Sequence, residues 1–93
     1  MTIGLLELDL RIPEAHSLKA KRMVLRSVRD RLRNAFNISV AEVEGGDALQ
    51  HSVLGVAHVS NEQKFSNQVL SKVVAFVERE RGIELVDYHL TFL

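Results

Sequence analysis

The feature that most constrains the fold of this chain is the spacing of its apolar residues. Twice along the 93 residues this spacing changes from the two-residue period of a strand to the roughly 3.6-residue period of a helix. Apolar and polar residues alternate from Gly4 to Ile12, which is the period of a strand with one buried face. From Leu18 to Phe36 the apolar residues instead recur every three or four positions, and no Gly or Pro interrupts them. Ser17 precedes this stretch as a candidate N-cap. The first third of the chain therefore predicts a strand followed by an amphipathic helix.

The middle of the chain predicts two strands joined by a tight turn. Asn37–Val43 is rich in β-branched residues, and His51–Val59 is largely apolar. Between them, the segment Glu44-Gly45-Gly46-Asp47 is the strongest turn signal in the sequence, because glycine adopts backbone conformations closed to other residues. Gly55 and Ala57 are expected to be small enough to let a helix pack closely against the second of these strands.

A second helix and a last strand complete the chain. Ser60 and Gln63 have the spacing of a capping box, and the helix is expected to run to about Arg81 before Gly82 ends it. The last strand, Ile83–Leu93, is predicted to place four apolar residues on one face: Val86, Tyr88, Leu90 and Phe92.

The resulting order of strand, helix, strand, strand, helix, strand is the βαββαβ pattern of ferredoxin-like folds. Such an α+β sandwich has a four-stranded antiparallel sheet with two helices on one face. No linker, low-complexity tract or charge block interrupts residues 1–93, so we expect one domain.

Composition excludes several classes of protein. The chain has no Cys, which excludes a disulfide scaffold, a thiolate metal site and a cysteine nucleophile. Its N-terminus lacks the basic region and apolar core of a signal peptide, and no apolar run approaches the roughly 18 residues of a membrane span. We therefore expect a cytoplasmic protein that does not associate with membranes.

The charge is neutral overall but uneven along the chain. Lys and Arg total 12, as do Asp and Glu, yet the stretch from Ser17 to Phe36 contains seven basic residues and only Asp30 as an acid. Five of the basic residues are spaced three or four apart, so on a helix they form a stripe about 80° wide beside the apolar face. The stripe consists of Lys19, Arg22, Arg26, Arg29 and Arg33.

Two interpretations of this stripe stay open. Basic side chains along one helix face can contact several phosphates of a nucleic-acid backbone, and arginine binds phosphate through two parallel hydrogen bonds. Alternatively, the aliphatic stems cover the edge of the core while the charges stay in water or pair with carboxylates of neighbouring elements. The first interpretation predicts RNA or a ribosomal particle as the partner, bound through shape and phosphate contacts rather than by reading bases.

Lys21 differs from the stripe because its helical position falls inside the apolar face, near Leu18, Val28 and Leu32. In one interpretation its ammonium passes the edge of the sheet and reaches water. In the other it points into a groove and binds an anion beside the helix N-terminus, where backbone N–H groups favour negative charge. Lys21 is for that reason the leading single candidate for an anion-binding residue.

The sheet face without helices offers a second surface. It is expected to carry Leu5, Glu7, Asp9, Leu85, Asp87 and His89. Cross-strand polar pairs explain its charges; Asp87 and His89 also belong to the ligand types of divalent metals, but no metal-binding motif accompanies them and no metal site is assigned. With Ala41 or Val43, the apolar residues provide a surface for self-association. A small homo-oligomeric structural or regulatory domain, joined through its sheet face or edge, is therefore the alternative function.

The signatures of common enzyme classes are missing. Gly45-Gly46 is not followed by the Gly-Lys-Ser/Thr of a phosphate-binding loop, and no Gly-x-Ser-x-Gly marks a serine nucleophile. His16, His51 and His58 occur singly, as surface or hydrogen-bonded histidines do. The open sheet face also lacks the aromatic residues on which bases stack in RNA-recognition motifs. We expect an interaction module and assign neither a catalytic residue nor a cofactor.

Four segments spread over the chain carry a family resemblance. They are Ser17–Arg22, Arg33–Val43, Leu54–Asn61 and Leu85–Tyr88. In these segments, and most specifically in the motifs Ser-Leu-Lys-x-Lys-Arg and Phe-Asn-x-Ser-Val-Ala-Glu, the chain resembles the YlxP-like family of small bacterial proteins of unknown function. It departs from the family at Ala48-Leu49, where members often carry Trp or another large residue.

The resemblance implies a ferredoxin-like fold over essentially the whole chain. It brings no established activity, cofactor or catalytic residue with it. Genes of the family often lie beside those of translation-initiation and ribosome-maturation factors, which implies a ribosome-linked role.

Overall fold

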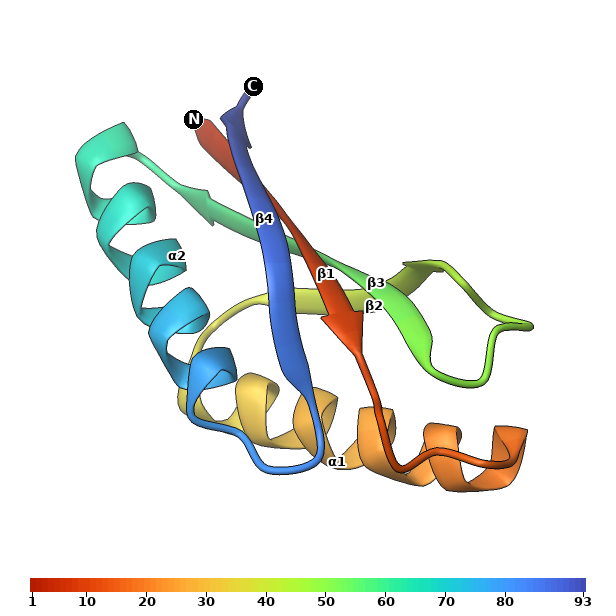
Figure 1. The fold of residues 1–93 in the computed structure, drawn as a ribbon. Coiled ribbons are helices and arrows are strands. Elements are labelled where there is room, and N and C mark those ends of the chain that lie inside the picture. Colours follow the sequence, from red (N-terminus) through yellow and green to blue (C-terminus); the bar gives the residue numbers. More distant parts are fainter.

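The structure, a computed structural model, describes all 93 residues and confirms the βαββαβ order (Figure 1). The elements are β1 (Thr2–Arg11), α1 (Leu18–Ala35), β2 (Ser39–Glu44), β3 (His51–Ser60), α2 (Gln63–Glu78) and β4 (Glu84–Phe92). The strands form one antiparallel sheet in the order β2-β3-β1-β4, with β3 and β1 in the centre and β2 and β4 at the edges. The prediction of a ferredoxin-like α+β fold is thereby confirmed.

The ends of the helices follow local capping. Ser17 caps α1 as predicted, because its Oγ accepts a hydrogen bond from the N–H of Ala20 at 3.0 Å. Helix α2 ends at Glu78 rather than near Arg81, and Gly82 then turns the chain into β4 with a φ of 85°. Neither helix has the combination of length and apolar character that crossing a membrane requires.

A polar cluster replaces the predicted capping box at the start of α2. The N-cap residue is Glu62, and its side chain makes no capping bond. Ser60 Oγ instead accepts from the N–H of Glu62 at 3.2 Å and lies 2.6 Å from Ser66 Oγ. Ser66 Oγ lies 2.8 Å from Nδ1 of His58, whose side chain is buried. The cluster therefore satisfies polar groups of β3 and α2 that face each other in the interior.

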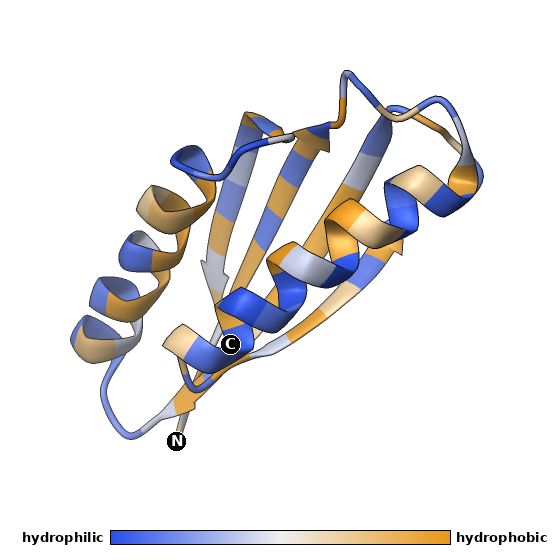
Figure 2. Cartoon of the chain, turned by 90° about the horizontal axis from the view of Figure 1, so that it is seen from below, coloured by the Kyte–Doolittle hydropathy of each residue, from blue (hydrophilic) through white to orange (hydrophobic).

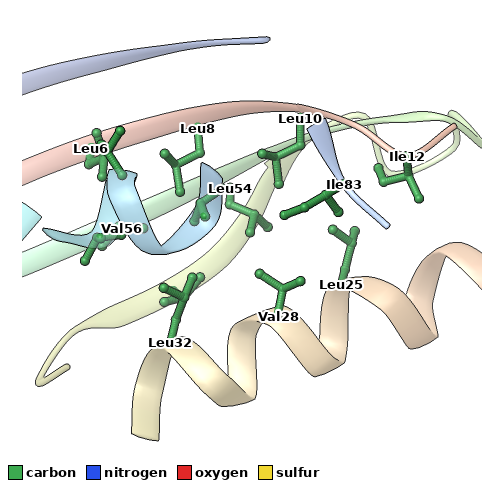
Figure 3. Close-up of a cluster of buried hydrophobic side chains, with 14 of the residues drawn as sticks. Leu6, Leu8, Leu10, Ile12, Leu25, Val28, Leu32, Leu54, Val56 and Ile83 are labelled. Atoms are coloured by element: carbon green, nitrogen blue, oxygen red, sulfur yellow. The ribbon is translucent and has the colours of Figure 1, made fainter. Parts of the chain in front are cut away.

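Both helices cover one face of the sheet and enclose the hydrophobic core (Figure 2). The central strand β1 contributes three fully buried leucines: Leu6, Leu8 and Leu10. Helix α1 contributes Leu25, Val28 and Leu32. Figure 3 shows these side chains of α1 directed at Leu54 of β3 and at Ile83. Each such buried side chain stabilises the fold by about 1.5–3 kcal/mol, so one side of α1 is held against the sheet and the other is left in solvent.

A bulge in β4 changes which of its residues face the core. The pairing of β1 with β4 shifts, so that Asp9 lies opposite Asp87 but Leu10 lies opposite Leu85. Val86 is the extra residue and is 62% exposed, whereas Leu85 packs against the core. The prediction that Val86 faces the core and Leu85 the open face is therefore wrong, because one inserted residue reverses the alternation on one side of the bulge.

Candidate anion-binding surface on helix α1

The buried residues of α1 recur at helical spacing on the side that faces the sheet: Lys21, Leu25, Val28 and Leu32. The polar side of the helix therefore faces away from the sheet. The first turn of α1 contains no acidic residue, so no carboxylate there offsets the positive end of the helix dipole. The surroundings of the five stripe residues divide them into two groups.

Three cations of the stripe lie together on the N-terminal half of α1. Lys19, Arg22 and Arg26 are exposed and form no ion pair within the chain. Together with Met23, which is 65% exposed, they line a surface hollow of about 290 Å³. We name Lys19, Arg22 and Arg26 the basic surface. Because no carboxylate of the protein neutralises them, their charge is available to an external anion.

The other two stripe residues make internal contacts. Arg33 donates from Nη2 to the carbonyl oxygen of Val40 in β2 at 2.9 Å, and its Nη1 lies 3.6 Å from Asp30. Arg29 is half-buried, and its Nε is enclosed without a hydrogen-bond partner. The second interpretation of the stripe therefore describes this half of α1, where the guanidinium groups lie against the protein's own surface.

Arg31, which is basic but lies outside the stripe, connects α1 to the segment after α2. Its Nε and Nη2 each donate to a carboxylate oxygen of Glu80 at 2.8 Å, and its Nη1 donates to Ser27. The hydrogen bonds to Glu80 raise the pKa of the Arg31 guanidinium above its already high ordinary value. Arg31 is therefore a permanent cation that holds two segments together rather than part of an open surface.

Lys21 holds the turn between β2 and β3. Its side chain is 1% exposed, and its Nζ donates to the carbonyls of Gly45 and Ala48, the second at 2.6 Å. The same Nζ lies 3.1 Å from Oε2 of Glu42. Three contacts use all three N–H donors of the ammonium. The interpretation in which the Lys21 ammonium reaches water is therefore wrong. Because the ammonium has no donor left for an external anion either, we leave Lys21 out of the basic surface.

Glu42 is the acidic partner of this buried lysine. Burial by itself would raise the pKa of Glu42, but hydrogen bonds from Ser52, at 2.6 Å, and from Lys21, together with the charges of Lys21 and Arg29, hold the pKa below its ordinary value. The pair fixes the N-terminal half of α1 against β2 and the following turn. It thereby positions the basic surface without belonging to it.

Sequence reasoning missed this network, although one signal for it was present. A lysine inside an apolar helix face needs acceptors in the interior. The turn Gly45-Gly46 leaves backbone carbonyls that need donors. The two features complement each other, but they lie 24 positions apart in the sequence, and only the packed structure brings them together.

The open face of the sheet carries an apolar hollow of about 380 Å³. Gly55 and Ala57 line it from β3, and Leu5 and Glu7 line it from β1. The prediction that Gly55 makes room for a helix is wrong, because it makes room for Val43: a Cβ at Gly55 would lie 2.9 Å from Cγ1 of Val43.

The charged side chains of this face lie near one another both within β4 and across neighbouring strands. His51 Nε2 lies 2.7 Å from Oδ1 of Asp9, and His89 Nε2 lies 3.8 Å from Oδ2 of Asp87. Asp9 and Asp87 are direct partners across β1 and β4, and so are Glu7 and His89. The protein contains no group of three or more His, Asp or Glu side chains arranged to hold a metal ion.

Comparison with known proteins gives a family match over nearly the whole chain. A family model described as "Protein of unknown function (DUF503)" matches residues 3–90. The uncharacterized protein YlxP of Bacillus subtilis (strain 168) is 37% identical over 82 residues, which cover 88% of this chain and 89% of that protein. This similarity confirms the resemblance found in the sequence.

Two solved structures share the fold at low sequence identity. LarC2, the C-terminal domain of a cyclometallase involved in synthesis of the NPN cofactor of lactate racemase, matches with a TM-score of 0.50 and 9% identity, over 100% of this chain and 55% of its own. The de novo designed protein Ferredog-Diesel matches with a TM-score of 0.50 and 12% identity, over 98% of this chain and 84% of its own. At such identities the likeness concerns the fold alone.

Proposed function

We propose that this chain, which belongs to the DUF503 family of proteins of unknown function, is a non-enzymatic cytoplasmic module that binds RNA or a ribosomal particle through the basic surface of α1. The observation that carries the proposal is the grouping of Lys19, Arg22 and Arg26, exposed and unpaired, around one hollow. The ribosome-linked role implied by the YlxP-like resemblance points in the same direction.

The spacing of the basic surface suits a phosphate backbone. Lys19 and Arg26 are seven residues apart, which is about 10 Å along a helix. Successive phosphates of one DNA strand advance by about 3.4 Å along the duplex axis, and at a comparable spacing in RNA the three cations extend over about three phosphate steps. Arg22 and Arg26 can each donate two parallel hydrogen bonds to a phosphate, whereas Lys19 acts as a point charge.

The expected binding mode follows the backbone and does not read sequence. Helix α1 contains no aromatic residue on which a base could stack. Contacts to phosphate fix register and orientation but carry no sequence information. We therefore expect affinity that depends steeply on salt and little on base composition.

Affinity capture from cell lysate tests the proposal. The native protein is compared with a K19E/R22E/R26E variant, and each capture is performed with and without nuclease. The matched control is K64E/K72E/R81E, which makes the same change of charge at exposed positions in and after α2. We expect nuclease-sensitive RNA or ribosomal particles with the native protein and the control, and none with the α1 variant. Equal capture by all three proteins would contradict the proposal.

The salt dependence of binding gives a second measurement. Each phosphate contact contributes about 0.7–0.9 to the slope of log K against log salt concentration. The slope measured with purified RNA should therefore fall by about one when Arg22 is replaced by Gln. A slope near zero for the native protein would contradict phosphate binding.

The second candidate function is a homo-oligomeric structural or regulatory domain. Exposed apolar side chains outside the helices favour it: Val43, Val59 and Val86 are 55%, 58% and 62% exposed. Light scattering at tens of micromolar tests it directly. Leu5→Lys is the variant suited to the sheet face, whereas Leu85 is unsuitable because it packs against the core.

A further inference from the structure

The two edges of the sheet differ in how well they are protected from pairing with another strand. β2 has only six residues, contains a bulge, and has one carbonyl, that of Val40, occupied by Arg33. β4 has nine residues and contains no Lys, Arg or Pro, which commonly block an exposed edge. Its bulge lies toward one end, at Val86, and leaves Asp87–Phe92 in regular pairing. β4 therefore presents an edge open to a further strand.

The backbone groups that β4 directs at this edge follow from its pairing with β1. In an antiparallel pair each residue directs its N–H and C=O to the same side, and successive residues alternate. The N–H of Leu93 donates to the carbonyl of Ile3 at 2.9 Å, so residues 87, 89, 91 and 93 face β1. The N–H of Tyr88 accordingly turns away from β1 and donates to the Asp87 carboxylate at 2.8 Å. Tyr88 and Leu90 thus carry backbone groups that a partner strand can pair.

The carboxylates beside this edge are only partly compensated within the chain, because His51 lies 2.7 Å from Asp9 but His89 lies 3.8 Å from Asp87. Asp87 and His89 lie on the open face with side chains 65% and 75% exposed. Asp87 faces Asp9 across the β1–β4 pair, and like charges directly opposite each other are unfavourable. On its other side Asp87 faces no strand, because β4 is the edge. A hydrogen-bond donor or cation placed there would offset the repulsion.

We propose that β4 pairs antiparallel with β4 of a second copy of this chain, about a two-fold axis at Tyr88. This inference rests on the self-association offered above as the second function, and it leaves the basic surface of α1 free. Pairing of outward-facing residues allows an axis at any residue from 87 to 90 in the regular part of the strand, and an axis at Leu90 places His89 opposite the partner's Thr91. An axis at 87 opposes two aspartates, and an axis at 89 opposes two histidines. Only the axis at Tyr88 places each Asp87 opposite the partner's His89.

In this register the two copies exchange equivalent contacts, as a two-fold dimer requires. Tyr88 forms two backbone hydrogen bonds with its own copy in the partner. Its N–H therefore passes from the Asp87 carboxylate to the partner's carbonyl, and Asp87 becomes free to meet the partner's His89. Asp87 and His89 occupy the non-hydrogen-bonded positions, where side chains of opposite strands lie closest together. The two carboxylate–imidazole pairs select the register.

A cysteine scan tests the register, because the native chain contains no Cys. A residue on the axis faces its own copy with the Cα atoms about 5.5 Å apart, which is within disulfide range. Under mild oxidation at tens of micromolar, Y88C should form covalent dimers. V59C, also exposed but in the central strand β3, controls for random collision. D87C and H89C should each crosslink poorly alone and efficiently when the two variants are mixed.

Charge variants test the same register without crosslinking. H89D opposes two carboxylates at both symmetric positions, and it should weaken the dimer at least about tenfold in sedimentation or light scattering. The exchanged variant D87H/H89D restores opposite partners and should recover most of the native affinity. Circular dichroism of each variant checks that the exposed substitutions leave the monomer folded.

The outcomes separate this inference from the wider proposal. A native protein that stays monomeric at tens of micromolar contradicts both self-association and the β4 contact. A dimer in which Y88C crosslinks no better than V59C leaves self-association in place and overturns the β4 contact. Crosslinking of D87C alone as efficient as that of Y88C would place the axis at residue 87 and overturn the proposed register.

Discussion

The two halves of α1 carry the same kind of residue and use it in opposite ways. In the N-terminal half, Lys19, Arg22 and Arg26 point into solvent around a hollow and contact no carboxylate. In the C-terminal half, Arg31 binds both oxygens of Glu80 and Arg33 binds the carbonyl of Val40. A run of basic residues on a helix can therefore serve either internal pairing or binding of an external anion. Which role each residue has depends on whether other elements bring hydrogen-bond acceptors within its reach.

The largest effect that we expect is a difference in RNA affinity between variants of the N-terminal half and variants of the C-terminal half of α1. K19E/R22E/R26E should reduce affinity for purified RNA about a hundredfold or more, because three phosphate contacts become repulsive. R31E/R33E changes charge on the same helix but removes internal contacts, so it should lower the unfolding midpoint and alter affinity much less. Filter binding at fixed salt, with urea unfolding of both variants, checks this. Similar losses of affinity in both variants would erase the distinction between the halves.

The next effect concerns the buried lysine that positions the N-terminal half. Lys21→Met keeps the aliphatic stem but removes the cation beside Glu42, which retains only the hydrogen bond from Ser52, and the ammonium donor to two carbonyls. Loss of one partner of a buried ion pair costs about 3–5 kcal/mol, so we expect a loss near the lower end of that range in urea unfolding. Lys19→Met, two positions away and exposed, is the matched control and should change stability by less than about 0.5 kcal/mol. Equal losses would contradict the role assigned to Lys21.

A smaller effect depends on pH and comes from Glu42. The pKa of Glu42 is lower in the folded protein than its ordinary value of 4.5, so the unfolded chain takes up this proton first as the pH falls. The stabilisation is therefore complete above about pH 5 and is lost as the pH falls through the folded pKa. Unfolding free energies measured along this range should fall less steeply for Glu42→Gln than for the native protein. Glu78→Gln, exposed on α2, should retain the native dependence.

The smallest expected effect belongs to the pair between Arg31 and Glu80. Arg31 is well exposed, and solvent and salt screen exposed ion pairs. Arg31→Ala should lower the thermal midpoint only slightly, and less so at high salt, while RNA binding stays at the native level. Arg22→Ala should give the reverse result, with unchanged thermal unfolding and weaker binding. A larger loss of binding for Arg31→Ala than for Arg22→Ala would show that the halves have been assigned the wrong way round.

Much of the fold was predictable because its signals are local. The alternation from Gly4 to Ile12 and the helical spacing from Leu18 to Phe36 each lie within one element, and Ser17 caps α1 as predicted. The prediction failed at Leu85 and Val86, where one inserted residue reverses the alternation. A bulge depends on the register with β1, about 75 positions away along the chain. The alternation of apolar and polar residues within β4 does not determine that register.

For the candidate site too, some features follow from the sequence and others only from the tertiary structure. The sequence by itself determined that seven basic residues share one helix and that five of them form a stripe, because helical geometry turns spacing into direction. Only the tertiary structure decided which of these charges are free. Arg31 meets Glu80 across 49 positions and Lys21 meets the carbonyl of Gly45 across 24. Whether a charge is neutralised depends on neighbours in space, and packing supplies those neighbours.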